Sequence, residues 1–168
     1  MKKSFTKIRV LAVASSGGHW VQLQRMRLAW DGCDVSYITT QIGYKQQVLD
    51  DANVRKLAEP GYYVVVDASR WQKLRLIWQM LQILRIVIKV RPNVVVSTGA
   101  APGFFALKFG KWLGSNTIWV DSIANAEALS LSGQKIQSSA DVWLTQWQHL
   151  GDCNGQTETK PGFFGSVI

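Results

Sequence analysis

A short run of small and polar residues, Ser15-Ser16-Gly17-Gly18-His19, directly follows the apolar segment 8–14. This order predicts a buried strand, a tight turn and the start of a helix. Glycine allows the turn and lets a ligand approach the backbone, and the unpaired N–H groups that open a helix favour anions such as phosphates. His19 is placed to act as a base or to contact a phosphate, although a structural or capping histidine fits equally well. The loop lacks the Gly-Lys-Ser/Thr of a Walker-type nucleotide site.

Two further loops place candidate groups after predicted strands. Segment 98–103, which begins with Thr98 and Gly99, is rich in small residues and has tight packing as its alternative role. Asp121, Ser122 and Asn125 follow the next strand, where a carboxylate faces a cleft or, alternatively, caps a helix. Because the carboxyl ends of parallel strands meet at one edge of a sheet, we expect the three loops to converge there.

The elements that position these loops alternate along the chain. Strands are predicted over 8–14, 35–39, 62–66, 93–97, 117–120 and 140–145, and helices over 20–30, 44–52, 70–90 and 104–113. This alternation indicates βαβ units, and strands that are apolar throughout indicate a sheet covered on both faces. The predicted fold is an α/β, Rossmann-like, mostly parallel sheet with helices on both faces. Residues 1–150 form this domain, and 151–168 are expected to be an irregular tail.

Composition narrows the class of protein. With 168 residues, 47% of them hydrophobic and 18% charged, the chain is long and apolar enough for one folded domain. The net charge of +8 favours an anionic partner, which is a nucleic acid, a phosphorylated substrate or an anionic lipid. Cys33 and Cys153 show no metal spacing, so we expect free thiols in a cytoplasmic protein and no metal. No apolar run approaches the roughly 18 residues of a transmembrane helix, and segment 8–14 lacks the cleavage site of a signal peptide.

The predicted helix over 70–90 has an apolar face wider than one contact with a sheet needs. Its polar residues fall on one stripe: Gln72, Arg75, Gln79, Gln82, Arg85 and Lys89. The remaining face is expected to cover the sheet and also a partner chain or a membrane surface, since the cations suit anionic lipid. An ordinary buried helix with a solvated basic stripe is the alternative.

A second stretch, 102–119, interleaves aromatic residues with lysines. This pattern suits a membrane interface and also nucleic-acid stacking, but the chain carries no nucleic-acid-binding motif. The residues expected on the membrane or partner face are Arg70, Trp71, Lys73, Trp78, Arg85, Lys89, Phe104, Phe105, Lys108 and Trp112.

The combination of several segments resembles one known family. The segments are 16–19, 91–99, 121–122 with 129–134 (Leu-Ser-Leu-Ser-Gly-Gln), and 140–147, which ends in Gln-Trp. Together they are similar to the acceptor-side, membrane-anchoring subunit of the two-chain UDP-GlcNAc transferase of the dolichol pathway. The PssD-like proteins of capsule and exopolysaccharide synthesis are the bacterial relatives of that subunit. The resemblance spans about residues 8 to 147.

The resemblance implies one half of an inverting glycosyltransferase, with the fold of the N-terminal domain of a GT-B enzyme. A separate small subunit would bind the UDP-sugar, and the complex would extend a capsule or exopolysaccharide repeat unit on a polyprenyl pyrophosphate. This places the chain peripherally at the cytoplasmic face of the inner membrane. We expect little or no activity from the chain alone, no cofactor and no nucleic-acid partner. A non-catalytic scaffold or activator of a partner glycosyltransferase is the alternative.

The resemblance also implies roles for individual residues. His19 and Asp121 would be catalytic, and Asp121 stands where the eukaryotic pattern has Glu before Ser. Either carboxylate serves as base or positions the acceptor. The acceptor and its phosphates would contact Ser16, Gly17, Gly18, Thr98, Gly99, Ser122 and Asn125. Because the eukaryotic N-terminal anchor has no counterpart in this sequence, anchoring is expected to fall to 70–90 and 102–119.

Overall fold

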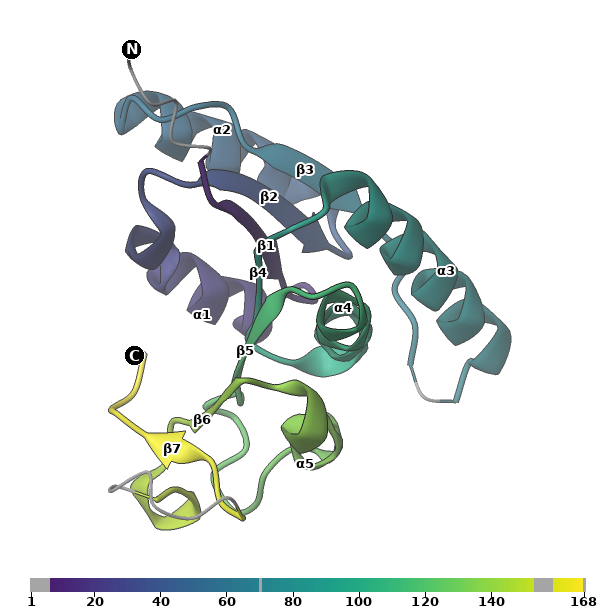
Figure 1. The fold of residues 1–168 in the computed structure, drawn as a ribbon, viewed down its shortest axis with the longest axis vertical. Helices are drawn as coiled ribbons and strands as arrows, with labels where there is room; N and C mark the ends of the chain where they lie inside the picture. The colour runs from purple at the N-terminus through teal and green to yellow at the C-terminus, as the bar shows by residue number, and fades with distance from the viewer. Residues whose placement is uncertain (1–6, 70, 153–158, 168) are drawn as a thin grey trace.

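The computed structural model describes residues 7–69, 71–152 and 159–167. Its strands form one seven-stranded sheet in the order β3-β2-β1-β4-β5-β6-β7, and every neighbouring pair is parallel. The strands are β1 (Arg9–Val13), β2 (Asp34–Thr39), β3 (Gly61–Val64), β4 (Val94–Ser97), β5 (Asn116–Val120), β6 (Val142–Thr145) and β7 (Gly162–Phe163). The predicted parallel α/β sheet is therefore confirmed (Figure 1).

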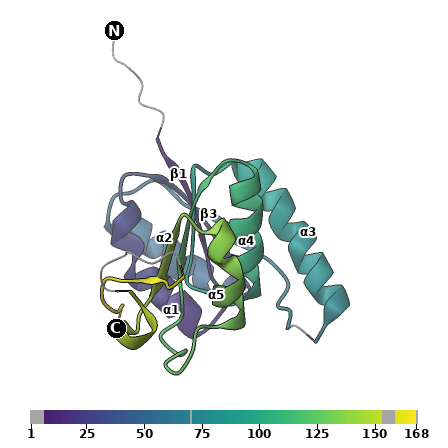
Figure 2. The same cartoon turned by 60° about the horizontal axis from the view of Figure 1, so that its bottom comes forward.

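Helices connect successive strands. The α-helices are α1 (Gly18–Arg25), α2 (Lys45–Val54), α3 (Lys73–Val90), α4 (Ala100–Trp112) and α5 (Leu131–Ile136), and the 3₁₀ helices are η1 (Arg27–Trp30), η2 (Ile42–Tyr44), η3 (Gln137–Ser139) and η4 (Gln148–Leu150). Figure 2 shows α3, α4 and α5 side by side, and α4 packs against both of the others. In the part of the chain described, no helix is both long and apolar enough to cross a membrane.

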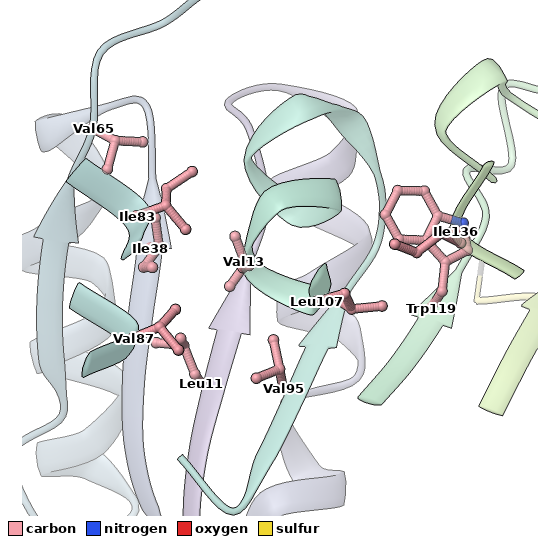
Figure 3. Packing of buried hydrophobic residues seen from close by; sticks show 11 residues of the cluster. Leu11, Val13, Ile38, Val65, Ile83, Val87, Val95, Leu107, Trp119 and Ile136 are labelled. Atoms are coloured by element: carbon pink, nitrogen blue, oxygen red, sulfur yellow. The ribbon is translucent and has the colours of Figure 1, made fainter. Parts of the chain in front are cut away.

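Alternation along the central strands separates two cores. Leu11 and Val13 of β1 point into a core formed with α3, α4 and α5, which Figure 3 shows. Val10 and Ala12 point to the opposite core, formed with α1 and α2. Both faces of the sheet are therefore covered, which explains why its strands are apolar throughout.

Several predicted boundaries differ from the structure. The helix predicted over 20–30 is α1 followed by η1, and α4 begins at Ala100 because Pro102 is tolerated in a first helical turn. The short helix α5 was not predicted. The tail predicted as irregular from 151 contains β7, whose Gly162 and Phe163 pair with the end of β6.

The order of the strands reverses at the centre of the sheet. From β1 the chain builds outward through β2 to β3, and α3 then carries it back to β4 on the other side of β1. In open α/β sheets, ligands bind outside the carboxyl ends of the strands at such a switch point. The loops after β1 and β4 border this point, and the loop after β5 lies next to them.

Candidate functional site

His19 and Thr98 join the two loops at the switch point. Nδ1 of His19 lies 2.9 Å from the carbonyl oxygen of Thr98, and Oγ1 of Thr98 donates to the carbonyl oxygen of His19 at 2.7 Å. Because a carbonyl only accepts, Nδ1 is the protonated nitrogen in this contact. In the neutral tautomer that this contact allows, Nε2 carries the lone pair, and the side chain is partly exposed. This is the arrangement of a base that a backbone carbonyl orients.

Gly99 makes this position of His19 possible. A β-carbon at residue 99 would lie 2.6 Å from Cε1 and 2.7 Å from Nδ1 of the imidazole, and the backbone φ of +129° is one that side chains rarely adopt. The absence of a side chain at Gly99 therefore leaves room for the imidazole of His19. The packing role given as the alternative for segment 98–103 is therefore present at Gly99, and contact of this loop with an acceptor stays a prediction.

The glycine loop after β1 is open where α1 begins. The N–H groups of Ser16 and Gly17 donate to Oγ1 of Thr40 and to the hydroxyl of Tyr44, both at 3.1 Å. A β-carbon added at Gly17 or Gly18 would meet no atom within 4 Å. No side chain caps α1, and its first turn contains no acidic residue. The first amides of α1, from Gly18 onward, are thus better placed for an anion than those of Ser16 and Gly17.

The start of α4 shares these properties. No side chain caps α4 and its first turn is free of acidic residues, while the N–H of Gly99 donates to Oγ of Ser97 at 3.1 Å. The positive ends of α1 and α4 therefore lie at the same edge of the sheet, on either side of the contact between His19 and Thr98.

Asp121 follows β5 at the predicted edge, but its carboxylate is buried, with only 1% of the residue exposed. Oδ1 accepts from Oγ of Ser130 at 2.6 Å and from Nε1 of Trp119 at 3.3 Å. Oδ2 accepts from the backbone N–H of Ser130 at 2.9 Å and from the amide of Asn125 at 3.4 Å. Oγ of Ser130 in turn accepts from the N–H of Gly133 and caps α5. Asp121 therefore holds the loop between β5 and α5.

A buried amide network links this loop to α1. Nε2 of Gln22 donates to Oγ of Ser122 at 3.3 Å, and Oε1 of Gln22 accepts from Nε2 of Gln146 at 2.8 Å. Gln146 also donates to the carbonyl oxygen of Asp121 at 2.9 Å. The network fixes the position of the third loop relative to the first.

The structure brings most of the predicted site residues to one edge in two groups. One group is the contact of His19 with Thr98 and Gly99, and the other is Asp121 with Ser122 and Asn125. No hydrogen bond joins His19 to Asp121, both of which are described. Sequence reasoning missed Ser130, Gln22 and Gln146. Ser130 and Gln146 lie in segments that carry the family resemblance, whereas nothing distinguishes Gln22 from a solvated helical glutamine.

Helix α3 exposes apolar side chains, buries Gln79 and partly buries Gln82. Its outer face, defined here by Leu74, Ile77, Trp78, Leu81 and Ile88, has exposed fractions from 36% to 85%. Facing inward, Gln79 donates to the carbonyl oxygen of Val66 at 2.7 Å, and Gln82 accepts from the N–H of Val66 at 2.9 Å. The alternative of a solvated polar stripe therefore does not hold at Gln79 and Gln82, whose side chains bind the backbone of the chain after β3. The wide apolar face predicted for this helix is confirmed.

Other residues of the predicted membrane or partner face divide into exposed and packed ones. Trp71 and Trp112 are 79% and 75% exposed, whereas Phe104 and Phe105 are half-buried and pack against the core. Phe104 and Phe105 keep part of their surface exposed, so their place on a membrane or partner face stays a prediction. Lys73 is exposed, and Arg70 lies outside the described residues.

Within residues 7–69, 71–152 and 159–167, three cations lie against aromatic rings. The guanidinium of Arg85 stands 5.7 Å from the ring centre of Trp78, the ammonium of Lys89 5.3 Å from that of Tyr63, and that of Lys108 5.7 Å from that of Phe104. Of these, Arg85 and Trp78 place a cation directly on the exposed side of α3.

Comparison with known proteins identifies relatives by sequence. The family model described as "Oligosaccharide biosynthesis protein Alg14 like" matches residues 64–162, more than half of the chain. A UDP-N-acetylglucosamine transferase subunit ALG14 from Candida glabrata is 39% identical over 54 residues, which is 27% of this chain and 22% of that protein. The subunit of the same name from Yarrowia lipolytica is 32% identical over 75 residues, or 41% and 35% of the two chains. The matched segments thus span about a fifth to a third of these relatives.

Comparison of structures supports the fold assignment. The chain matches Acinetobacter baumannii MurG with a TM-score of 0.66 at 15% identity, over 95% of this chain and 45% of that one. A UDP-N-acetylglucosamine 2-epimerase from Rickettsia bellii matches with a TM-score of 0.62 at 12% identity, over 96% and 46%. At these identities the similarity concerns the fold. The predicted Rossmann-like fold is confirmed, and it is similar to a part of each of these two proteins.

Proposed function

This chain belongs to the family of Alg14-like oligosaccharide biosynthesis proteins, and we propose that it is the acceptor-binding subunit of a two-chain, inverting UDP-sugar transferase. A separate small subunit binds the UDP-sugar, which is the donor substrate, and the proposed reaction uses no cofactor. The acceptor is a glycan on a polyprenyl pyrophosphate at the cytoplasmic face of the inner membrane. The product is a longer repeat unit of a capsule or exopolysaccharide, as in the PssD-like proteins.

The contact between His19 and Thr98 at the switch point is the observation that carries this proposal. Nε2 of His19 takes the proton of the acceptor hydroxyl as its oxygen forms the bond to C1 of the donor sugar. The bond from C1 to the UDP oxygen breaks, and UDP leaves with the electron pair. The N–H at Nδ1 stays hydrogen-bonded to the carbonyl oxygen of Thr98, and this hydrogen bond keeps the ring in the required tautomer. The N–H groups that open α1 and α4 stabilise the oxygens of the acceptor pyrophosphate at the same edge of the sheet.

Asp121 is a positioning residue in this proposal. Its carboxylate is enclosed by donors from Ser130, Trp119 and Asn125, so it is poorly placed to receive a proton from an acceptor hydroxyl. It instead shapes the loop that borders the acceptor, together with Ser122. His19 is therefore the base in this proposal.

The outer face of α3 is the membrane contact in this proposal. Exposed leucine, isoleucine and tryptophan side chains enter the interface, and Lys73 and Arg85 attract anionic headgroups. Trp71 and Trp112 extend the exposed aromatic surface. The edge of the sheet at the carboxyl ends of the strands, where the acceptor binds in this proposal, then lies near the lipid that carries the substrate.

Substitution of His19 in the assembled complex tests the proposal. The chain is co-purified with its UDP-sugar-binding partner, and turnover is compared for the native complex, His19→Gln and His19→Ala. We expect a loss of about a hundredfold or more with the complex intact. His149→Gln, which removes the other histidine, is the matched control and is expected to retain activity. Unchanged turnover in both His19 variants would support the scaffold alternative, in which the partner carries every catalytic group.

A further inference from the structure

An apolar groove lies between the first turns of three helices. Its cavity of about 250 Å³ is lined by Leu76 of α3, Ala101, Phe104 and Phe105 of α4, and Leu131, Ser132 and Lys135 of α5. Phe104 and Phe105 form one wall, with their rings edge to face at 5.7 Å. Among the described residues that line the groove, Lys135 is the only charged one. Nothing in the mechanism proposed above uses this cavity.

The groove adjoins the candidate site on two sides. Ala101 follows Gly99 by two residues, so one wall begins where the loop that contacts His19 ends. Leu131 directly follows Ser130, whose hydroxyl donates to Asp121, so another wall begins where the third loop ends. The groove therefore adjoins both groups of site residues, the one around His19 and the one around Asp121.

The third side of the groove leads to the exposed face of α3. Leu76 lies between Leu74 and Ile77 in the sequence, and these two neighbours are 85% and 51% exposed. Figure 2 shows α3, α4 and α5 side by side, and residues of all three helices line the groove. Apolar side chains thus continue from the outer face toward the switch point.

We propose that this groove holds the first isoprene units of the prenyl chain next to the acceptor pyrophosphate. The inference rests on the proposed function. A sugar or nucleotide needs several polar groups around it, whereas this groove offers mainly carbon side chains, which suit a hydrocarbon. The ammonium of Lys135 complements a phosphate at the polar end of such a chain. A prenyl pyrophosphate is the occupant that matches both an apolar groove and adjacent anion-binding loops.

Binding of farnesyl pyrophosphate and of inorganic pyrophosphate to the purified chain tests this inference without any activity assay. We expect farnesyl pyrophosphate to bind at least about tenfold more tightly, since burial of only two CH₂ groups has that effect. Ser132→Phe, which fills the groove, should remove the difference while pyrophosphate binding stays unchanged. Ser132→Ala leaves the groove open and is the matched control. Equal affinity of the native chain and Ser132→Phe for farnesyl pyrophosphate would overturn the inference.

Photolabelling of the native chain gives a second readout that does not depend on the folding of a variant. A farnesyl pyrophosphate with a diazirine near its pyrophosphate should label segments 101–105 and 131–135. Labelling confined to the outer face of α3 would indicate a general lipid surface, as would labelling that dodecylphosphocholine displaces fully. Either result would overturn the inference that the groove binds the prenyl chain.

The same measurements separate the groove from the proposed function. If farnesyl pyrophosphate binds and Ser132→Phe abolishes its binding while inorganic pyrophosphate does not bind at all, the groove is supported and the acceptor-phosphate site fails. If pyrophosphate binds and the prenyl chain adds no affinity, the phosphate site is supported and the groove fails.

Discussion

The backbone of Gly99 lies against the imidazole of His19 so closely that a β-carbon at residue 99 would come within 2.6 Å of Cε1. His19 is the second residue of α1, which follows β1, whereas Gly99 precedes α4 after β4, and the two are 80 positions apart in the sequence. Their contact, with the hydrogen bonds between His19 and Thr98, fixes the candidate base at the switch point. The position of His19 therefore depends on the absence of a side chain at residue 99.

Gly99→Ala should remove activity almost as completely as loss of His19, because the methyl group displaces the imidazole. Gly114→Ala is the control, since Gly114 also has a positive φ, +86°, but an added β-carbon there meets nothing within 4 Å. Both variants should lose about 1–3 kcal/mol of stability from backbone strain. We expect only Gly99→Ala to lose about a hundredfold in turnover of the complex, measured beside thermal unfolding. Equal turnover in the two variants would argue against a catalytic His19.

Asp121→Asn should destabilise the fold by about 3 kcal/mol, because an amide cannot accept from all the donors that surround the carboxylate. Ser130→Ala should cost about 1 kcal/mol through loss of the cap of α5. The two losses should be less than additive, since the side chains share one hydrogen bond of 2.6 Å. Urea unfolding of the single and double variants measures this coupling. Full stability of Asp121→Asn with lost turnover would instead indicate that Asp121 is the base.

Lys111 should stabilise the protein in a pH-dependent manner through Asp141. The hydrogen bond from the ammonium of Lys111, aided by the N–H and hydroxyl of Thr117, lowers the pKa of Asp141 below its ordinary value of 3.8. A carboxylate with a lowered pKa stabilises the folded state fully above the ordinary pKa, and this stabilisation is lost as the pH falls through the folded-state pKa.

Lys111→Gln should therefore lower the melting temperature modestly at neutral pH, and the difference from the native chain should shrink below about pH 4. The effect is small because both side chains are partly exposed. Lys108→Gln, in which the lost cation faces the ring of Phe104, should show no such pH-dependent difference. A difference in melting temperature that stays constant down to pH 2 would contradict the assignment to Asp141.

Leu74→Glu with Leu81→Glu should reduce binding to anionic vesicles by about tenfold or more, because two apolar side chains are replaced by negative charges. Stability should change little at Leu74, which is 85% exposed, and should fall at Leu81, which is 36% exposed, so thermal unfolding is measured beside binding. Val54→Glu on α2, where Val54 is 82% exposed, is the control for an added charge elsewhere. Co-sedimentation with vesicles measures the binding. Unchanged sedimentation of the double variant would leave a partner chain as the better occupant of this face.

The sequence by itself determined the layers of this protein and the edge at which its loops meet. Apolar runs separated by helical segments imply a parallel sheet covered on both faces, and parallel strands bring the loops that follow them to one edge. His19, Thr98 and Asp121 could be placed there because each follows a recognisable strand. These features depend on local pattern and on connectivity, which a single sequence contains.

Only the tertiary structure decided how the side chains at that edge are used. Burial of Asp121 depends on Ser130 and Trp119, and the approach of His19 to Gly99 depends on the pairing of β1 with β4. The inward turn of Gln79 depends on the polar backbone of Val66, which α3 covers. A helix period gives the angle between side chains but not which angle faces the sheet, since burial of a polar group depends on a partner distant in the sequence.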